Sequence, residues 1–115
     1  MNEVEMPLET RVRWEIWESF VSLLRSYAAA ASLSGKEYAV SSFSGGAKVE
    51  HQGRALRFSF RPTTGNGIWR SVRPEKQSWG GFHISEDGTF ASLTGSEALD
   101  AAAITWIEQL GEIST

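Results

Sequence analysis

The chain has 115 residues, of which 41% are hydrophobic and 22% are charged, and its formal net charge is −3. A chain of this length and composition forms one ordinary globular domain, so we expect residues 1–115 to be a single domain with one core. The absence of cysteine excludes disulfides, thiol nucleophiles and iron–sulfur sites.

The start of the chain bears on targeting. Residues Met1 to Glu5 are acidic and contain no apolar stretch, so we expect no signal peptide. No apolar run approaches the roughly 18 residues that a membrane span needs. Together with the absence of cysteine, these features favour a cytoplasmic protein with no membrane segment.

The charges are segregated along the chain. Residues 45–80 contain seven Lys and Arg against two Glu, which gives +5. Residues 81–115 contain six Asp and Glu and no Lys or Arg, which gives −6. Either the two segments neutralise each other, within one fold or across two subunits, or the basic segment forms an anion-binding surface. The first interpretation is favoured.

A long helix is predicted at the beginning of the chain. Apolar residues recur there at spacings of three and four, Pro7 suits the first turn, and Gly35 is a stop signal. Trp14, Trp17 and Val21 form a second apolar stripe. We therefore expect this helix to be contacted on more than one side.

From residue 37 onward the hydrophobic period changes to two and turn residues arrive at short intervals, which is typical of antiparallel strands. The predicted strands are Glu37–Phe43, Ala47–Gln52, Arg54–Arg61, Ile68–Arg73, Gly81–Glu86 and Thr89–Leu93. Residues Pro74–Gly80 are rich in polar side chains and are predicted to form a solvated loop. The glycine pair Gly80-Gly81 beside Trp79 permits a bulge or a close backbone approach.

Two short turns predict which strand residues face each other, because a hairpin loop fixes the register. A two-residue loop at Gln52-Gly53 and a turn at Ser44-Gly45 both place apolar residues opposite apolar residues. The predicted pairs are Val49 with Leu56, Ala47 with Phe58 and Val40 with Val49, and Tyr38 is predicted to lie near His51. These pairs define one apolar face of the sheet.

A third turn, at Asp87-Gly88, is the strongest hairpin signal in the chain. A two-residue loop there pairs Ile84 with Ala91 on the apolar face and places Phe90 on the opposite, outer face.

The connection 62–67 leaves the position of Trp69 open. An even loop places Trp69 on the apolar face, whereas a bulge places Ile68, Arg70 and Val72 there.

A second helix closes the chain. Thr94 and Glu97 have capping-box spacing at its start, and Gly111 ends it. The fold class predicted is therefore α+β: an antiparallel β-meander of five or six strands, with the long N-terminal helix and the C-terminal helix packed on one face. The main alternative is a strongly curved sheet that wraps around the first helix and encloses a pocket.

Motifs of catalytic and metal sites are missing from the sequence. We find no dinucleotide fingerprint, phosphate loop, nucleophile elbow, zinc-protease or calcium-loop pattern. A metal site would have to use His51, His83 and carboxylates. We interpret His83 as a polar strand residue and His51 as a hydrogen-bonded residue at a rim. We expect no metal, no cofactor and no catalytic activity.

Aromatic residues are in excess, with five Trp and six Phe, and most of them must fill the core. Some fall among arginines on the outer sheet face, a mixture typical of protein interfaces and of single-stranded nucleic-acid platforms. The candidate interaction residues are Phe43, Lys48, Arg57, Arg61, Trp69, Arg70, Arg73, Trp79 and Phe90.

These features favour a non-catalytic interaction module that forms a homodimer or binds another protein. One alternative is a single-stranded nucleic-acid-binding protein that uses Arg57, Arg61, Arg70 and Arg73, which an isoelectric point near 5.4 disfavours. The other alternative is a small-ligand binder with a pocket between a curved sheet and the long helix.

Overall fold

The computed structural model describes residues 7–33, 37–74, 76–92 and 95–111. The elements are α1 (Leu8–Ser32), β1 (Ala39–Phe43), β2 (Gly46–His51), β3 (Arg54–Arg61), β4 (Asn66–Arg73), β5 (Lys76–Ile84), β6 (Thr89–Ser92), β7 (Gly95–Ala98) and α2 (Leu99–Gly111). The predicted α+β class is confirmed. The sheet has seven strands where five or six were expected.

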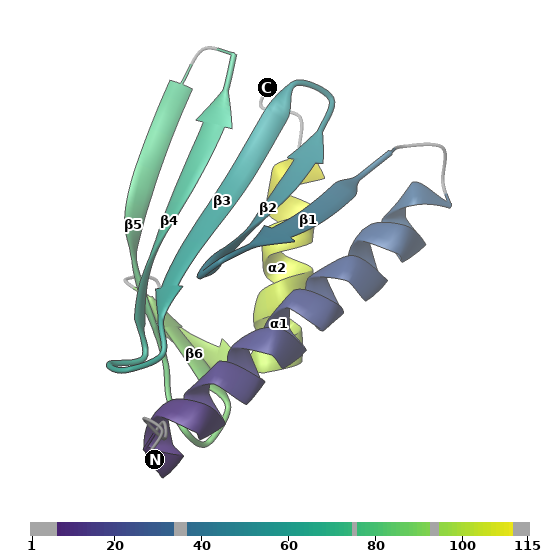
Figure 1. The fold of residues 1–115 in the computed structure, drawn as a ribbon. Coiled ribbons are helices and arrows are strands. Elements are labelled where there is room, and N and C mark those ends of the chain that lie inside the picture. Colours follow the sequence, from purple (N-terminus) through teal and green to yellow (C-terminus); the bar gives the residue numbers. More distant parts are fainter. Residues whose placement is uncertain (1–6, 34–36, 75, 93–94, 112–115) are drawn as a thin grey trace.

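Each strand pairs antiparallel with the next one along the chain, so the sheet is a meander in the order β1 to β7. Both helices pack against its apolar face, and they also contact each other (Figure 1). Among the described residues, β5 pairs with β6 through Phe82–Ile84, and the first part of β5 extends beyond that pairing. Among the described residues, no helix is long and apolar enough to cross a membrane.

The interior is built largely from aromatic rings. Phe20 of α1 and Phe58 of β3 are fully buried and meet edge-on, with ring centroids 5.5 Å apart. Phe58 also meets Trp106 of α2 edge-on at 5.5 Å, so one side chain links the sheet to both helices. Trp17, from the second apolar stripe of α1, is 2% exposed and stacks on Phe60 at 5.0 Å. Trp17 shares one buried stripe of α1 with Phe20 and Leu24, and α1 contacts both the sheet and α2. That α1 is contacted on more than one side stays a prediction.

The β2–β3 hairpin has the predicted register, with Val49 facing Leu56 across the Gln52-Gly53 loop. Both loop residues have positive φ, 51° and 79°. This is the type I′ geometry that matches the twist of a two-residue hairpin.

The β1–β2 hairpin is also as predicted, with Val40 facing Val49. The rings of Tyr38 and His51 stack with centroids 3.9 Å apart. His51 is hydrogen-bonded as expected, since its Nδ1 lies 2.8 Å from the carbonyl oxygen of Glu37. However, its exposure of 2% places it in the interior rather than at a rim.

The predicted two-residue loop between β5 and β6 is wrong. The N–H of Ser85 donates to the carbonyl oxygen of Thr89 at 3.0 Å, which leaves a three-residue loop that Gly88 closes with φ 86°. Such a loop adds one residue, and a slip of one residue turns every side chain of β6 to the other face. Phe90 therefore faces Ile84 and is 2% exposed, in the core rather than on the outer face.

The loop between β3 and β4 has an even number of residues. Arg61 faces Asn66 across a four-residue loop, and Phe58 faces Trp69. Trp69 therefore lies on the apolar face, which is the first of the two predicted alternatives.

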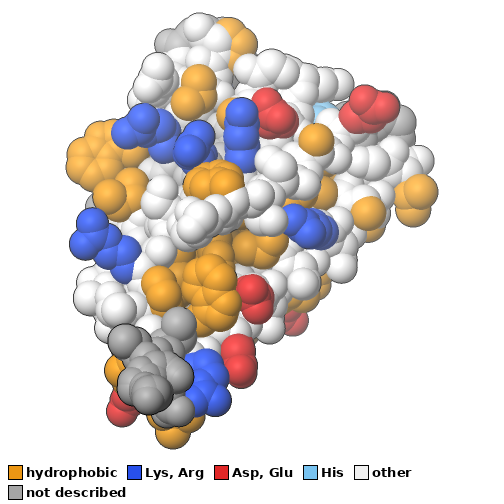
Figure 2. Space-filling view, in the orientation of Figure 1, with side chains coloured by type: hydrophobic (Ala, Val, Ile, Leu, Met, Phe, Trp, Pro, Cys, Tyr) orange, Lys and Arg blue, Asp and Glu red, His pale blue; other side chains and the backbone are white. Residues whose placement is uncertain are grey.

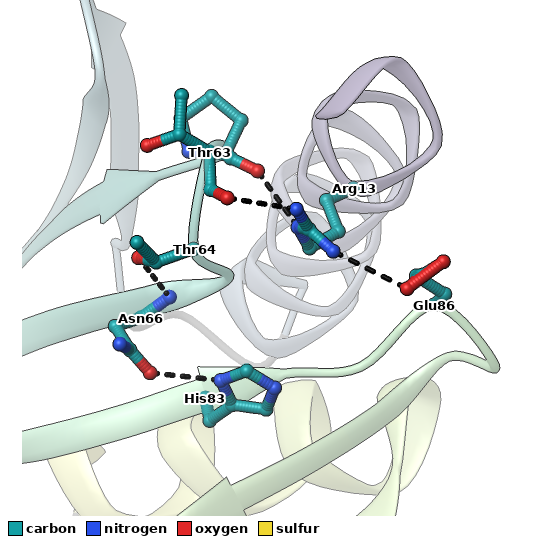
Figure 3. Close-up of polar contacts among 7 residues, drawn as sticks. Arg13, Thr63, Thr64, Asn66, His83 and Glu86 are labelled. Carbon is teal, nitrogen blue, oxygen red and sulfur yellow. Dashed lines mark hydrogen bonds and ion pairs between the residues drawn. The ribbon is translucent and has the colours of Figure 1, made fainter. Parts of the chain in front are cut away.

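A polar cluster holds this loop against α1 (Figure 3). Arg13 donates from Nε to the carbonyl oxygen of Pro62 at 2.7 Å and from Nη2 to that of Thr63 at 2.8 Å. Its Nη1 lies 3.3 Å from Oε2 of Glu86 in the β5–β6 loop. Arg13 thus connects the helix to two loops at one end of the sheet.

β5 begins inside the segment predicted as a solvated loop, so that prediction is wrong. Lys76 faces Arg73, and the pairing with β4 continues through Gly80, which faces Trp69. A Cβ at Gly80 would lie 2.8 Å from Cζ2 of Trp69. Of the two predicted alternatives, Gly80 therefore permits a close approach, here of the Trp69 ring, and the one-to-one pairing with β4 contains no bulge.

The predicted start of the second helix is wrong as well. Residues Gly95–Ala98 form β7, in which Glu97 faces Phe90 of β6, and α2 begins at Leu99. The predicted cap Thr94 and the predicted stop Gly35 lie outside the described residues. Asp100 accepts a hydrogen bond through Oδ1 from its neighbour's N–H in the first turn of α2.

Candidate interaction surfaces

Three cations form a row across the outer face of the sheet, the face turned away from the helices. Lys48 of β2 faces Arg57 of β3, and Arg57 faces Arg70 of β4. Adjacent strands lie about 4.8 Å apart, so these three side chains, the cation row, stand side by side. The row ends at Trp79 of β5, which faces Arg70 and is 70% exposed.

Exposed apolar side chains flank the cation row. Phe43 is 38% exposed and Ile68 is 51% exposed. The guanidinium carbon of Arg57 lies 4.5 Å from the centroid of the Phe43 ring, a cation–π contact. Figure 2 shows Lys and Arg side chains gathered on this face with hydrophobic side chains beside them. The surface therefore combines positive charge with flat apolar groups.

Acidic side chains are scarce beside the row. Glu50 lies 3.3 Å from Nζ of Lys48. The outward positions of β3, β4 and β5 carry three arginines, Arg57, Arg61 and Arg70, and no Asp or Glu. Two of these, Arg57 and Arg70, are directly opposite each other, and like charges in that position destabilise a sheet.

The ion pairs seen among the described residues include Arg13 with Glu86 and Lys48 with Glu50. Neither of these two pairs joins residues 45–80 to residues 81–115. Acidic residues of the last segment lie on α2, on the helix side of the sheet. These α2 acids are therefore on the opposite side of the sheet from the cation row.

The structure divides the predicted interaction residues between the two faces. On the outer face lie Phe43, Lys48, Arg57, Arg61, Arg70 and Trp79. Trp69, Arg73 and Phe90 lie on the helix side instead. The expectation of an outward Phe90 is wrong because of the extra loop residue before β6.

Two basic residues of segment 45–80 donate hydrogen bonds to the C-terminal end of α2. Arg73 donates to the carbonyl oxygen of Gln109 and Arg54 to that of Leu110, each at 3.0 Å. Cationic donors suit the last carbonyls of a helix, which have no partner within the helix and carry partial negative charge. Arg73 therefore does not belong to the outer basic face.

A groove of about 370 Å³ opens between β3–β5 and α2. Trp69 and Trp106 line it with ring centroids 5.2 Å apart. Its size falls in the range of small-molecule sites. A second hollow of about 330 Å³ lies between α1 and the β1–β2 hairpin, where Trp14 and Phe43 line it.

The backbone N–H and C=O groups of β5 point alternately to the two sides of the strand. The N–H of Ile84 donates to Gly65 at 2.7 Å on the β4 side, and the N–H of Ser85 donates to Thr89 at 3.0 Å on the β6 side. β5 pairs with β4 one residue to one residue throughout. Because antiparallel strands alternate in this way, even-numbered residues of β5 bond toward β4 and odd-numbered residues bond away from it.

The odd-numbered residues Gln77 and Trp79 therefore direct their N–H and C=O groups away from β4, to the free edge of β5. In the described part of the chain, no strand pairs with Lys76–Gly80 on that side. An open edge is a template for another strand. The polar composition of this segment predicts a loop, so the edge is not evident from the sequence.

The histidines have structural partners. His83 bonds through Nδ1 to Oδ1 of Asn66 at 2.8 Å, as expected of a polar strand histidine. Over the described ranges, no group of three or more His, Asp or Glu side chains is placed to hold a metal ion.

Comparison of the chain with protein-family models, curated proteins and solved structures gave no match. Its function has to be inferred from its own residues.

Proposed function

We propose that the protein is a non-catalytic interaction module that forms a homodimer through the free edge of β5. The observation that carries this proposal is the set of outward N–H and C=O groups on Gln77 and Trp79. A second copy satisfies them by antiparallel pairing about a two-fold axis, which is an isologous contact. With the axis at Trp79, Gln77 of each protomer faces Gly81 of the other.

The side chains at this edge suit such a pairing. Residues 77–81 carry no charged side chain, so the pairing brings no like charges together within the ladder. Trp79 is 70% exposed, and the two copies of its ring would lie side by side beside the axis. An uncharged open edge of this length is otherwise an aggregation hazard.

The test is the substitution Gln77→Pro. Proline removes an N–H that points to the free edge, so it leaves the hydrogen bonds to β4 in place. Gln77→Ala is the matched control because it keeps the N–H. By size-exclusion chromatography with light scattering at tens of micromolar, we expect dimers for the wild type and Gln77→Ala, and a folded monomer for Gln77→Pro. A monomeric wild type under these conditions would overturn the proposal.

The proposal also includes a cytoplasmic location and no cofactor. The chain contains no cysteine, which is compatible with a reducing compartment. Fractionation of cells that express a tagged chain tests the location, and the absorption spectrum and mass of the protein purified from them test the absence of a cofactor.

The groove favours small-ligand binding as a second candidate function. Trp69 and Trp106 offer ring surfaces to a flat apolar molecule. A saturable change of tryptophan fluorescence with an apolar dye, lost in Ser78→Leu because the larger side chain narrows the groove, would support it. An unsaturable response would count against it.

A further inference from the structure

We propose that the outer face of the sheet is a separate site, which binds single-stranded nucleic acid through the cation row. Lys48, Arg57 and Arg70 occupy one register line on three adjacent strands. Two strand intervals separate the first from the last, a span of about 10 Å. A chain of phosphates crossing the strands along this line meets all three cations and releases the counterions that it carries.

Aromatic groups favour nucleic acid over an acidic peptide. Trp79 is 70% exposed at one end of the row, and Phe43 is 38% exposed near the other. Bases stack on such rings whatever their sequence, and arginine adds cation–π contacts. Carboxylate side chains would use the cations but would leave the rings uncovered.

The overall negative charge does not oppose binding on this face. Glu50 lies beside Lys48, and on the outward positions of β3, β4 and β5 there is no further acid. Asp100 and Glu108 lie on α2, on the helix side of the sheet. At physiological salt, charges separated by more than about 8 Å are largely screened when exposed to solvent. The sheet therefore separates the acids of α2 from the cation row.

The opposed arginines give the proposal a signature that a purely structural role would not produce. Arg57 and Arg70 repel each other in the free protein, and bound phosphates relieve that repulsion. Arg70→Gln should therefore raise the urea midpoint of the free protein slightly while it weakens binding. Substitution of a residue that merely supported the fold would lower both the urea midpoint and the affinity.

The experiment is a fluorescence-anisotropy titration with a labelled oligothymidine of about six nucleotides, within the range that one small domain covers. Three phosphate contacts at roughly −0.7 each predict a slope of log affinity against log salt of about −2. For the double variant Arg57→Gln with Arg70→Gln, the slope should fall to about −0.7. At about 50 mM salt, each lost cation should weaken binding by roughly eightfold. The matched control is Arg11→Gln, which removes an exposed cation from α1.

Several outcomes would overturn the proposal. Undetectable binding at about 50 mM salt would remove the site, because counterion release is strong at that concentration. An unchanged slope in the double variant would place binding elsewhere on the molecule. Displacement of the oligonucleotide by an equal charge concentration of polyglutamate would reassign the face to an acidic protein. The β5 edge is tested separately, because Gln77→Pro leaves Lys48, Arg57 and Arg70 intact.

Discussion

Truncation of Phe58 should cost more stability than any other single change in the sheet. The side chain is fully buried, and the rings of Trp17, Phe20, Phe82 and Trp106 surround it edge-on with centroids 5.5 to 6.3 Å away. These rings come from both helices and from β5, so they cannot collapse together into the space that alanine leaves. Phe→Ala changes in cores cost about 3 to 5 kcal/mol, and edge-on contacts of this number favour the upper end.

The expected loss can be measured as a change of melting temperature. For 115 residues, an unfolding entropy of about 2.1 cal/mol/K per residue converts 3 to 5 kcal/mol into a decrease of about 12 to 20 °C. Thermal unfolding followed by far-ultraviolet circular dichroism gives this value. Phe43→Ala is the control, since that ring lies on the outer face. A decrease of less than about 3 °C for Phe58→Ala, or equal decreases for both variants, would refute the assignment of the core face.

Three further changes can be compared by urea unfolding. Gly67→Ala should cost about 1 to 3 kcal/mol, because the new Cβ would meet the Phe82 ring and a backbone carbonyl. Gly88→Ala should cost about 1 to 2 kcal/mol, because φ there is 86° and the penalty is conformational rather than steric. Glu108→Ala should stay within about 0.5 kcal/mol of the wild type, since Glu108 is exposed. A costly Glu108→Ala or a silent Gly67→Ala would contradict the packing described.

Local features were enough to predict most of the meander. The bounds of β3, Arg54–Arg61, were predicted as observed, because its alternation is regular and a two-residue loop precedes it. The two-residue loop permits one register between β2 and β3, and that register pairs apolar residues with apolar residues. Where turn chemistry and hydrophobic alternation point the same way, the sequence specifies which side chains face the core.

The errors arose where a local signal permitted two structures and tertiary packing chose between them. Asp87-Gly88 can close a loop of two or three residues, and Gly takes positive φ in both. The three-residue loop puts Phe90 into the core, where its ring lies 5.0 Å from Phe82 and 5.1 Å from Phe20. The free energy gained by burying this ring exceeds the small free-energy difference between the two turn types. The first half of β5 was predicted as a loop for a related reason. Its Gly80 is a turn signal in the sequence, but in the fold it makes room for Trp69 from the neighbouring strand.

The two proposed sites meet at Trp79, which faces Arg70 and also lies at the centre of the free edge. Antiparallel pairing of two β5 strands keeps both outer faces on the same side of a continuous sheet. The two cation rows would then form one line from β2 of one protomer to β2 of the other. That line spans seven strand intervals, or roughly 34 Å at about 4.8 Å each. An oligothymidine of about 15 nucleotides should engage both rows in the dimer, with a salt slope of about −4, and one row in the Gln77→Pro monomer, with a slope of about −2. Equal slopes for the dimer and the monomer would show that the two faces do not join, even if each proposal holds by itself.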